Sequence, residues 1–265
     1  MRVLVCVKHV PELVSDRGFT EAGHTRRTVD DSSLNEVDEN AVEAALQLAD
    51  GGEVIALTMG PAIASDALRR ALAMGADRAI HLLDDAFAGS DAIATARVLG
   101  AAIAKVNDSS TLDVVVAGLA ALDGLGAVVP SLVAAELGWP QLTVVEEIHA
   151  CGEGVQARRE LDGVTEVWRS PTPVVVSVTD LANQARLPKM KDLLAARSAE
   201  IIVWSPADLG LNSQEVGRAG SGTTVLTAQR RPPHPGPVLV TDDDGAGGAA
   251  LASYLIENDL MGARK

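Results

Sequence analysis

Apolar residues in the first 140 positions alternate between short β-branched runs and longer stretches in which they recur at helical spacing. The longer stretches predict four helices, the first of them capped by Asn35 and the others beginning near Ser65, Ser90 and Val129. The short runs predict four strands, at residues 2–7, 53–58, 79–83 and 113–117. Strands and helices that alternate in this way form a parallel sheet with right-handed crossovers and helices on both faces. The pattern therefore predicts a doubly wound α/β fold.

The pattern changes at residue 141, where period-2 runs separated by turn residues replace the helices. After residue 204, segments rich in Gly and Pro interrupt any core pattern, and only residues 251–260 predict a short helix. We therefore expect an α/β domain over residues 1–204 and a C-terminal arm over residues 205–265. Ordering an arm of this length by itself costs conformational entropy, so we expect it to wrap a partner chain. The period-2 runs predict short antiparallel strands that extend one edge of the sheet, at residues 142–148, 156–161, 165–168 and 173–178.

A glycine-containing turn separates the fourth strand from the fourth helix. Gly118, Gly124 and Gly126 would let backbone N–H groups approach a phosphate at the start of that helix, where the helix dipole also attracts anions. The turn matches neither GxGxxG nor GxxxxGK[ST], and a tight connection that needs glycine for its geometry alone explains the spacing equally well. The carboxyl ends of parallel strands are where such sheets bind ligands. Residues 7–9, residues 58–60 and the turn are therefore expected to converge on one ligand.

Composition narrows the classes of partner. The chain has 265 residues and a formal net charge of −14, and aromatic residues make up 2% of it. This charge repels phosphate backbones and anionic lipids, so nucleic acids and membrane surfaces are poor general partners. Cys6 and Cys151 lie far apart, and no apolar run approaches the roughly 18 residues of a membrane span. We therefore expect a cytoplasmic protein with no membrane insertion.

Patterns that identify catalytic or metal sites are not found in the sequence. The five histidines show no HxxxH spacing, no CxxC pair is present, and no GxSxG motif occurs. No catalytic and no metal-binding residue is therefore assigned. The residues alone indicate an α/β protein that binds a nucleotide and a partner chain.

One segment is locally basic in this acidic chain. Residues 182–200, ANQARLPKMKDLLAARSAE, contain Arg186, Lys189, Lys191 and Arg197. A solvated loop followed by an amphipathic helix would explain this pattern, and a contact surface for a partner would explain it as well.

Several blocks together resemble the β subunit of electron transfer flavoprotein. The resemblance runs in register over about residues 1–210, and its blocks are VKHV, LNEVDENAVEAALQL, GPAIASDALRRALAMGADRAIHL, DGLGAVVPSLVAAELGWPQ, RRELDGVTEVWRSPTPVVVSVTD and ARLPKMKDLLAAR. It implies a Rossmann-like sheet of the adenine nucleotide alpha hydrolase type and a C-terminal arm that wraps an α subunit. It also implies an electron carrier rather than an enzyme. In that family the α subunit holds most of the FAD, the β subunit buries AMP, and electrons pass from flavin-dependent dehydrogenases to a quinone reductase or similar acceptor.

The resemblance also implies where AMP would bind. Side chains that grip phosphate in many members are replaced here, because Ala127, Val128 and Val129 stand where an Asn or Gln and a Thr are common. The backbone N–H groups of Gly124 and Gly126 remain as donors. Electron-bifurcating relatives bind a second FAD with a DG-x-T-x-Q turn, and this chain keeps the DG but lacks the Thr and Gln, which argues against a second FAD. The implied cofactor-binding residues are Cys6, Asn35, Glu36, Val37, Asp38, Met59, Gly118, Asp123, Gly124, Gly126, Ala127, Val128 and Val129.

Partner-binding residues follow from the same resemblance. ARLPKMKDLLAAR matches the family's docking loop for dehydrogenases, with Met190 at the apolar anchor and Arg186, Lys189 and Lys191 beside it. The lysine run that usually follows is missing, so the dehydrogenase is not identified. Glu166 matches a signature glutamate near the subunit interface, and the alternative for it is a surface acid at a strand edge.

Two functions from different classes remain. The first is a redox carrier subunit, and the alternative is a stand-alone adenine-nucleotide-binding regulatory protein on the same scaffold. The C-terminal arm favours the carrier subunit, and the missing phosphate-binding side chains argue against the regulator.

Overall fold

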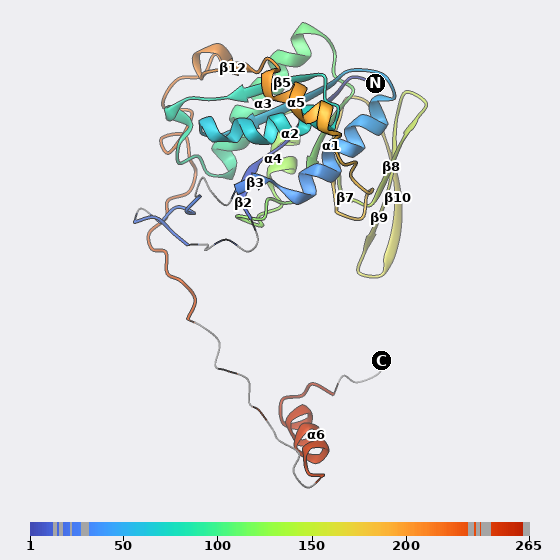
Figure 1. Cartoon of the computed structure of the whole chain (residues 1–265), viewed down its shortest axis with the longest axis vertical. Coiled ribbons are helices and arrows are strands. Elements are labelled where there is room, and N and C mark those ends of the chain that lie inside the picture. Colours follow the sequence, from blue (N-terminus) through green and yellow to red (C-terminus); the bar gives the residue numbers. More distant parts are fainter. Residues whose placement is uncertain are drawn as a thin grey trace. The chain divides into compact units, whose positions relative to one another are not determined.

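The computed structural model describes the whole chain except residues 13–14, 16–17, 22, 28–31, 233–235, 237–238, 240–244 and 262–265. The chain divides into two compact units, Met1–Ala228 and Gln229–Lys265. Figure 1 labels their helices and strands. No helix of the described residues is long and apolar enough to cross a membrane.

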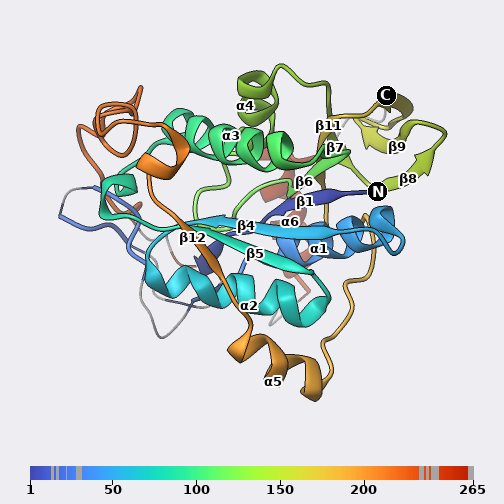
Figure 2. The ribbon, with the colours of Figure 1, turned by 90° about the horizontal axis from the view of Figure 1, so that it is seen from above.

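A central sheet of seven parallel strands organises the first unit, as Figure 2 shows. Strands β1, β4 and β6 lie next to one another at its centre, so their carboxyl ends meet at one edge of the sheet. The order across the sheet is β12 (Ile202–Trp204), β5 (Arg78–Leu82), β4 (Val54–Met59), β1 (Val3–Cys6), β6 (Val114–Gly118), β11 (Val174–Val178) and β7 (Gln141–Val145). The predicted doubly wound α/β class is confirmed.

Helices cover both faces of this sheet (Figure 2). Alternate residues of β1 point to opposite faces, so Val3 and Val5 pack beneath one helix layer and Leu4 packs beneath the other. The layer over Val3 and Val5 contains α1 (Glu36–Ala49) and α2 (Ser65–Met74), and the layer over Leu4 contains α3 (Ala92–Ser109) and α4 (Val129–Leu137). α5 (Met190–Ser198) lies beside α2. Short 3₁₀ turns occur at Ala62–Ala64, Asp85–Phe87 and Ala207–Leu209.

Local sequence explains where these helices begin and end. Asp91 caps α3, because its carboxylate accepts a hydrogen bond of 2.8 Å from the N–H of Ala94. Pro130 occupies the first turn of α4, where a missing N–H costs nothing, and Gly138 ends that helix in the left-handed conformation. Asn35 occupies the N-cap position of α1, but its side chain makes no capping bond. The prediction that the Asn35 side chain caps α1 is therefore wrong. Its amide instead bonds to residues of the candidate site that is described in the next subsection.

The antiparallel strands lie elsewhere than we expected. β8 (Glu147–Cys151), β9 (Gly154–Leu161) and β10 (Val164–Pro171) form a separate three-stranded sheet, and β7 and β11 join the central sheet in parallel. All five residues of β11 are buried, as in a strand covered on both faces, whereas most of β10 is exposed. A short antiparallel pair, β2 (His9–Pro11) with β3 (Ser32–Leu34), lies between β1 and α1 in the chain.

The first unit extends further along the chain than residue 204. Val216 is 1% exposed and packs in the core beneath α3, and Arg97 donates a hydrogen bond of 3.0 Å to the carbonyl of Glu215. Residues 205–228 therefore belong to the first unit, and only residues 229–265 are left of the expected arm. In the second unit, α6 (Gly247–Glu257) has no buried residue. Its wrapping around a partner stays a prediction.

We expect Gly118→Ala to destabilise the fold. A Cβ on Gly118 would overlap with Asp38 Oδ1 and lie 3.1 Å from the carbonyl carbon of Val37, so β6 and α1 would have to separate. Overpacking of this kind costs about 1–3 kcal/mol of unfolding free energy. Urea unfolding of the purified protein measures the loss. Gly124→Ala is the matched control, because no atom lies within 4 Å of the Cβ it would add. Equal unfolding midpoints in the two variants would contradict the expectation.

Candidate functional site

The carboxyl ends of the central strands and the start of α1 meet at one edge of the sheet. Cys6, Met59 and Gly118 are the last residues of β1, β4 and β6, and these three strands are neighbours. Glu36, Val37 and Asp38 form the first turn of α1; Glu36 is exposed and Asp38 is buried. The structure therefore brings three strand ends to one edge of the sheet beside the first turn of α1, and that these residues bind one ligand stays a prediction.

Asn35 ties α1 to the turn after β6. It is completely buried, and its Nδ2 donates to the carbonyl of Ala120 at 3.1 Å and to Asp38 Oδ1 at 2.9 Å. Its Oδ1 accepts a hydrogen bond of 3.0 Å from the N–H of Leu122. These bonds explain why the amide does not cap its own helix. They fix the position of residues 120–122 relative to α1.

Asp38 is a buried carboxyl that accepts hydrogen bonds from Lys8, Asn35 and the backbone of Gly118. Its Oδ2 accepts the N–H of Lys8 at 2.8 Å, and its Oδ1 accepts Asn35 Nδ2. Burial raises the pKa of Asp38 to about 7, although the bonds from Asn35 and Lys8 act in the opposite direction. Burial, and to a lesser extent the charge of Asp38, raises the pKa of the Cys6 thiol to about 12. Cys6 therefore stays protonated at neutral pH and is not a nucleophile.

Asp123 is paired with two cations at the same edge. Its side chain is 1% exposed, Lys8 Nζ lies 2.8 Å from its Oδ1, and Arg27 Nε lies 2.9 Å from its Oδ2. Burial alone would raise the pKa of Asp123, but Lys8 and Arg27 together lower it. Two cations therefore face one carboxylate here, so Asp123 balances only one of their two positive charges. We did not predict Arg27 as a site residue, and the Arg26-Arg27 pair within an acidic sequence was the available signal.

The turn before α4 presents free backbone donors. The N–H groups of Gly126, Ala127, Val128 and Val129 make no hydrogen bond to any residue that the structure describes. Gly124 differs from our expectation, because its N–H donates to the carbonyl of Ala121 at 3.2 Å and closes the turn. Free N–H groups at a helix N-terminus form an anion site. The turn can therefore bind a phosphate through backbone donors, with Lys8 and Arg27 nearby as counter-charges.

A second candidate region is the loop at residues 181–189 together with the start of α5, where two apolar side chains are exposed. Met190 is 72% exposed, and Leu187 is more exposed, at 83%. Lys189 and Lys191 are also exposed. We did not predict Leu187, and the signal for it was an apolar residue before Pro188 in an otherwise polar loop. The Arg186 guanidinium is bonded to Glu43 and its side chain is 49% exposed, so its contact with a partner stays a prediction.

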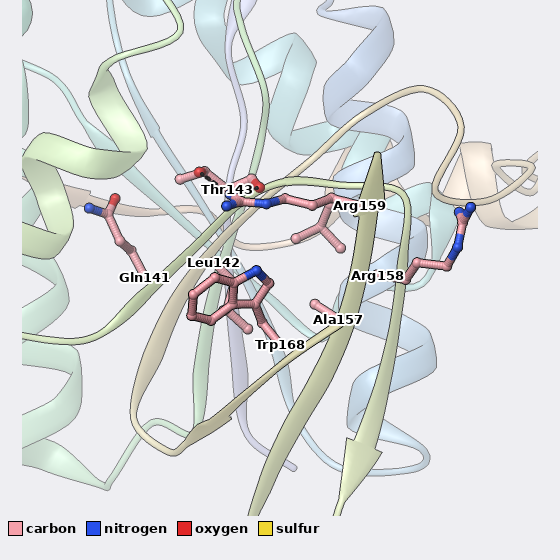
Figure 3. A pocket seen from close by; sticks show the side chains of 8 residues that line it. Gln141, Leu142, Thr143, Ala157, Arg158, Arg159 and Trp168 are labelled. Carbon is pink, nitrogen blue, oxygen red and sulfur yellow. Dashed lines mark hydrogen bonds between the residues drawn. The ribbon is translucent and has the colours of Figure 1, made fainter. Parts of the chain in front are cut away.

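Glu166 lies on β10, beside a hollow of about 120 Å³ between β7 and the three-stranded sheet. Figure 3 shows the Trp168 ring and the Arg159 side chain facing Leu142 and Thr143, with Arg158 pointing away. Glu166 Oε2 accepts Arg159 Nε at 2.6 Å and Trp168 Nε1 at 3.1 Å. The bond from Arg159, and then that from Trp168, lowers the pKa of Glu166. Glu166 is therefore an ionised side chain held within its own sheet.

We expect the titration of Asp38 to lower the free energy of unfolding as the pH rises from about 4 to about 7. Its pKa rises from 3.8 to about 7 on folding, so in this range the folded chain holds a proton that the unfolded chain has released. The contribution of one such group is at most about 1.4 kcal/mol per pH unit, and it levels off above pH 7. Urea unfolding at pH 5, 6, 7 and 8 measures it. Asp38→Asn removes the titrating group, so an unchanged slope in that variant would contradict the assignment.

Comparison with known proteins identifies a family. The family model described as "Electron transfer flavoprotein domain" matches residues 26–209. "Electron transfer flavoprotein subunit beta" of Mycobacterium tuberculosis (strain ATCC 25618 / H37Rv) is 38% identical over 267 residues, which cover 98% of this chain and 99% of that protein. "Protein FixA" of Azorhizobium caulinodans is 38% identical over 232 residues, 85% of this chain and 83% of its own length. "Electron transfer flavoprotein subunit beta" of Clostridium acetobutylicum is 36% identical over 85% of this chain and 86% of its own. On these matches, this chain belongs to the electron transfer flavoprotein family.

Proposed function

We propose that this chain is the β subunit of a heterodimeric electron transfer flavoprotein. The observation that carries the proposal is the match to mycobacterial β subunits over nearly the full length of both chains. The chain would carry electrons, with its α subunit, from flavin-dependent dehydrogenases to a quinone reductase or similar acceptor. FAD, held mostly by the α subunit, supplies the redox chemistry when bound. The names of the relatives support this role and not the stand-alone regulator.

AMP is the ligand that we propose for the sheet edge. The free N–H groups of residues 126–129 and the cations Lys8 and Arg27 fit a phosphate. Asn35 and Asp38 keep the turn in place beside α1. Val128 and Leu125 present exposed apolar side chains at the turn, so phosphate would be held by backbone rather than by side-chain hydroxyl or amide groups. The nucleotide would then have a structural role, because no redox group is part of AMP.

Docking of dehydrogenases is proposed at the segment around α5. Leu187 and Met190 provide exposed apolar contacts, and Lys189 and Lys191 add positive charge that speeds association. A small apolar contact with a charged rim suits a complex that must form and dissociate quickly. The segment therefore supports a shuttle role.

We expect the chain to bind FAD only as part of the heterodimer. Co-expression with its α-type partner should yield a 1:1 complex with a flavin absorbance spectrum, whereas the chain purified alone should hold little flavin. AMP should be released from the complex when it is denatured, as detected by chromatography of the supernatant. Stoichiometric FAD on the isolated chain, or no complex with the α subunit, would contradict the proposed function.

Leu187→Ala and Met190→Ala should slow electron transfer from the cognate dehydrogenase. Each removes an exposed apolar contact, and one anchor residue of an interface typically contributes about 1–2 kcal/mol, or about 5- to 30-fold in binding. The measurement is the KM for the dehydrogenase in a coupled assay that uses the heterodimer.

Met190→Leu is the matched control for this assay, because it keeps an apolar side chain of similar volume. The flavin spectrum and heterodimer mass should stay unchanged in all three variants. A KM unaffected in both alanine variants would place docking elsewhere on the molecule.

A further inference from the structure

The proposed docking segment has little apolar packing to hold it. Residues 181–189 lie outside any helix or strand, and Ala196 is the single buried residue of α5. Only the small side chains of Ala182 and Ala185 pack against the core before the helix. Burial of so little apolar surface contributes little to holding the segment in place. Its position therefore depends on polar contacts.

Two asparagines join the start of the segment to α1. Asn40 Nδ2 donates to the carbonyl of Asn183 at 2.8 Å, and Asn183 Nδ2 donates to the carbonyl of Asn40 at 2.9 Å. The two residues are 143 positions apart in the sequence. This reciprocal pair fixes the backbone of the segment at Asn183 to the second turn of α1.

An ion pair fixes the segment again, one helical turn further along α1. Arg186 Nε lies 2.6 Å from Glu43 Oε2 and Arg186 Nη2 lies 3.0 Å from Glu43 Oε1, so the pair is bidentate. The N–H of Arg186 adds a bond of 3.3 Å, and Gln47 Nε2 donates to Glu43 Oε1 at 3.0 Å. Glu43 is 7% exposed at its side chain, so the carboxylate is ordered before any partner arrives.

The far end of the segment is attached to α2. Arg69 Nη1 donates to the carbonyl of Ala196 at 2.7 Å and to that of Ala199 at 3.5 Å. These carbonyls belong to the last turn of α5 and to its C-cap residue, where a cation also complements the helix dipole. Leu187 and Met190 lie between the two attachment points and are themselves exposed.

We propose that Asn40, Glu43 and Arg69, with their partners Asn183 and Arg186, form a polar clamp that positions Leu187 and Met190 for docking. Arg186 is then a positioning residue that faces α1, and not a charge that contacts the dehydrogenase. The inference rests on the docking proposed above. A clamped segment presents its apolar residues already ordered, so the entropy cost of ordering it is not repeated at each encounter.

The test uses two substitutions with opposite effects on charge, made in the heterodimer. Glu43→Gln removes a negative charge and Arg186→Gln removes a positive one, yet both weaken the same clamp. If Arg186 contacted the dehydrogenase directly, Glu43→Gln would release it and leave the KM for the dehydrogenase unchanged or lower. If the clamp positions the segment, both variants raise that KM by about threefold or more at unchanged kcat. Hydrogen exchange of residues 181–195 should be faster in both.

Arg197→Gln is the matched control, because it removes one positive charge from α5, the helix that follows Arg186, and no described residue bonds to the Arg197 side chain. It should leave both hydrogen exchange and the KM near the values of the unsubstituted heterodimer. A KM that rises equally in Arg197→Gln and Arg186→Gln would show a general charge effect and overturn the clamp.

The clamp and the docking proposal can fail separately. Faster exchange in Glu43→Gln with an unchanged KM, while Leu187→Ala still raises the KM, overturns the positioning role and leaves docking in place. An unchanged KM in Leu187→Ala, Met190→Ala and Glu43→Gln overturns docking at this segment, and the positioning role with it. Unchanged exchange in both Glu43→Gln and Arg186→Gln shows that the segment is held by other contacts.

Discussion

Asp38 joins β1, α1 and the turn after β6 through one buried carboxyl group. One oxygen accepts the N–H of Lys8, two residues after the end of β1, and the other accepts a hydrogen bond from the amide of Asn35. The Asn35 side chain also forms hydrogen bonds with the carbonyl of Ala120 and the N–H of Leu122, in the segment after β6. Gly118 has no side chain at the closest approach of β6 to this carboxyl. Because buried polar groups are costly without partners, every member of this network depends on the others.

Two neighbouring carboxyl groups at this edge have opposite pKa shifts. Asp38 is buried without a cation bonded to its carboxyl, so its pKa rises, whereas Asp123 is buried with Lys8 and Arg27, so its pKa falls. At neutral pH one carboxyl is partly protonated and the other is ionised. Lys8 and Arg27 together carry one more positive charge than Asp123 balances, close to the turn that holds the free N–H groups. A local anion site can exist in this way on a chain whose net charge is −14.

α1 is common to both candidate regions. Its first turn holds the residues of the sheet edge, and Asn40 and Glu43, on its following turns, hold the segment before α5. Asn40 and Glu43 are three residues apart, so they are neighbours on the surface of α1 and can both bond to the same segment. The helix is itself held in place by its own apolar residues Ala41, Val42 and Ala45, which are buried in the core. A rigid scaffold of this kind lets function be placed on loops and on weakly packed segments.

The sequence alone determined the alternation of strands and helices between residues 35 and 140, and it placed residues 7–9, residues 58–60 and the turn at Gly118 at strand ends, because hydrophobic periodicity is a local property. The family was also recognised from local blocks, and the comparisons confirmed it. Only the tertiary structure decided that β7 and β11 join the sheet in parallel, that Arg27 pairs with Asp123, and that Arg186 pairs with Glu43. These last two pairs are separated by 96 and 143 positions. Strand pairing and ion pairs between distant residues depend on how the chain folds back on itself, and no spacing along the sequence encodes that.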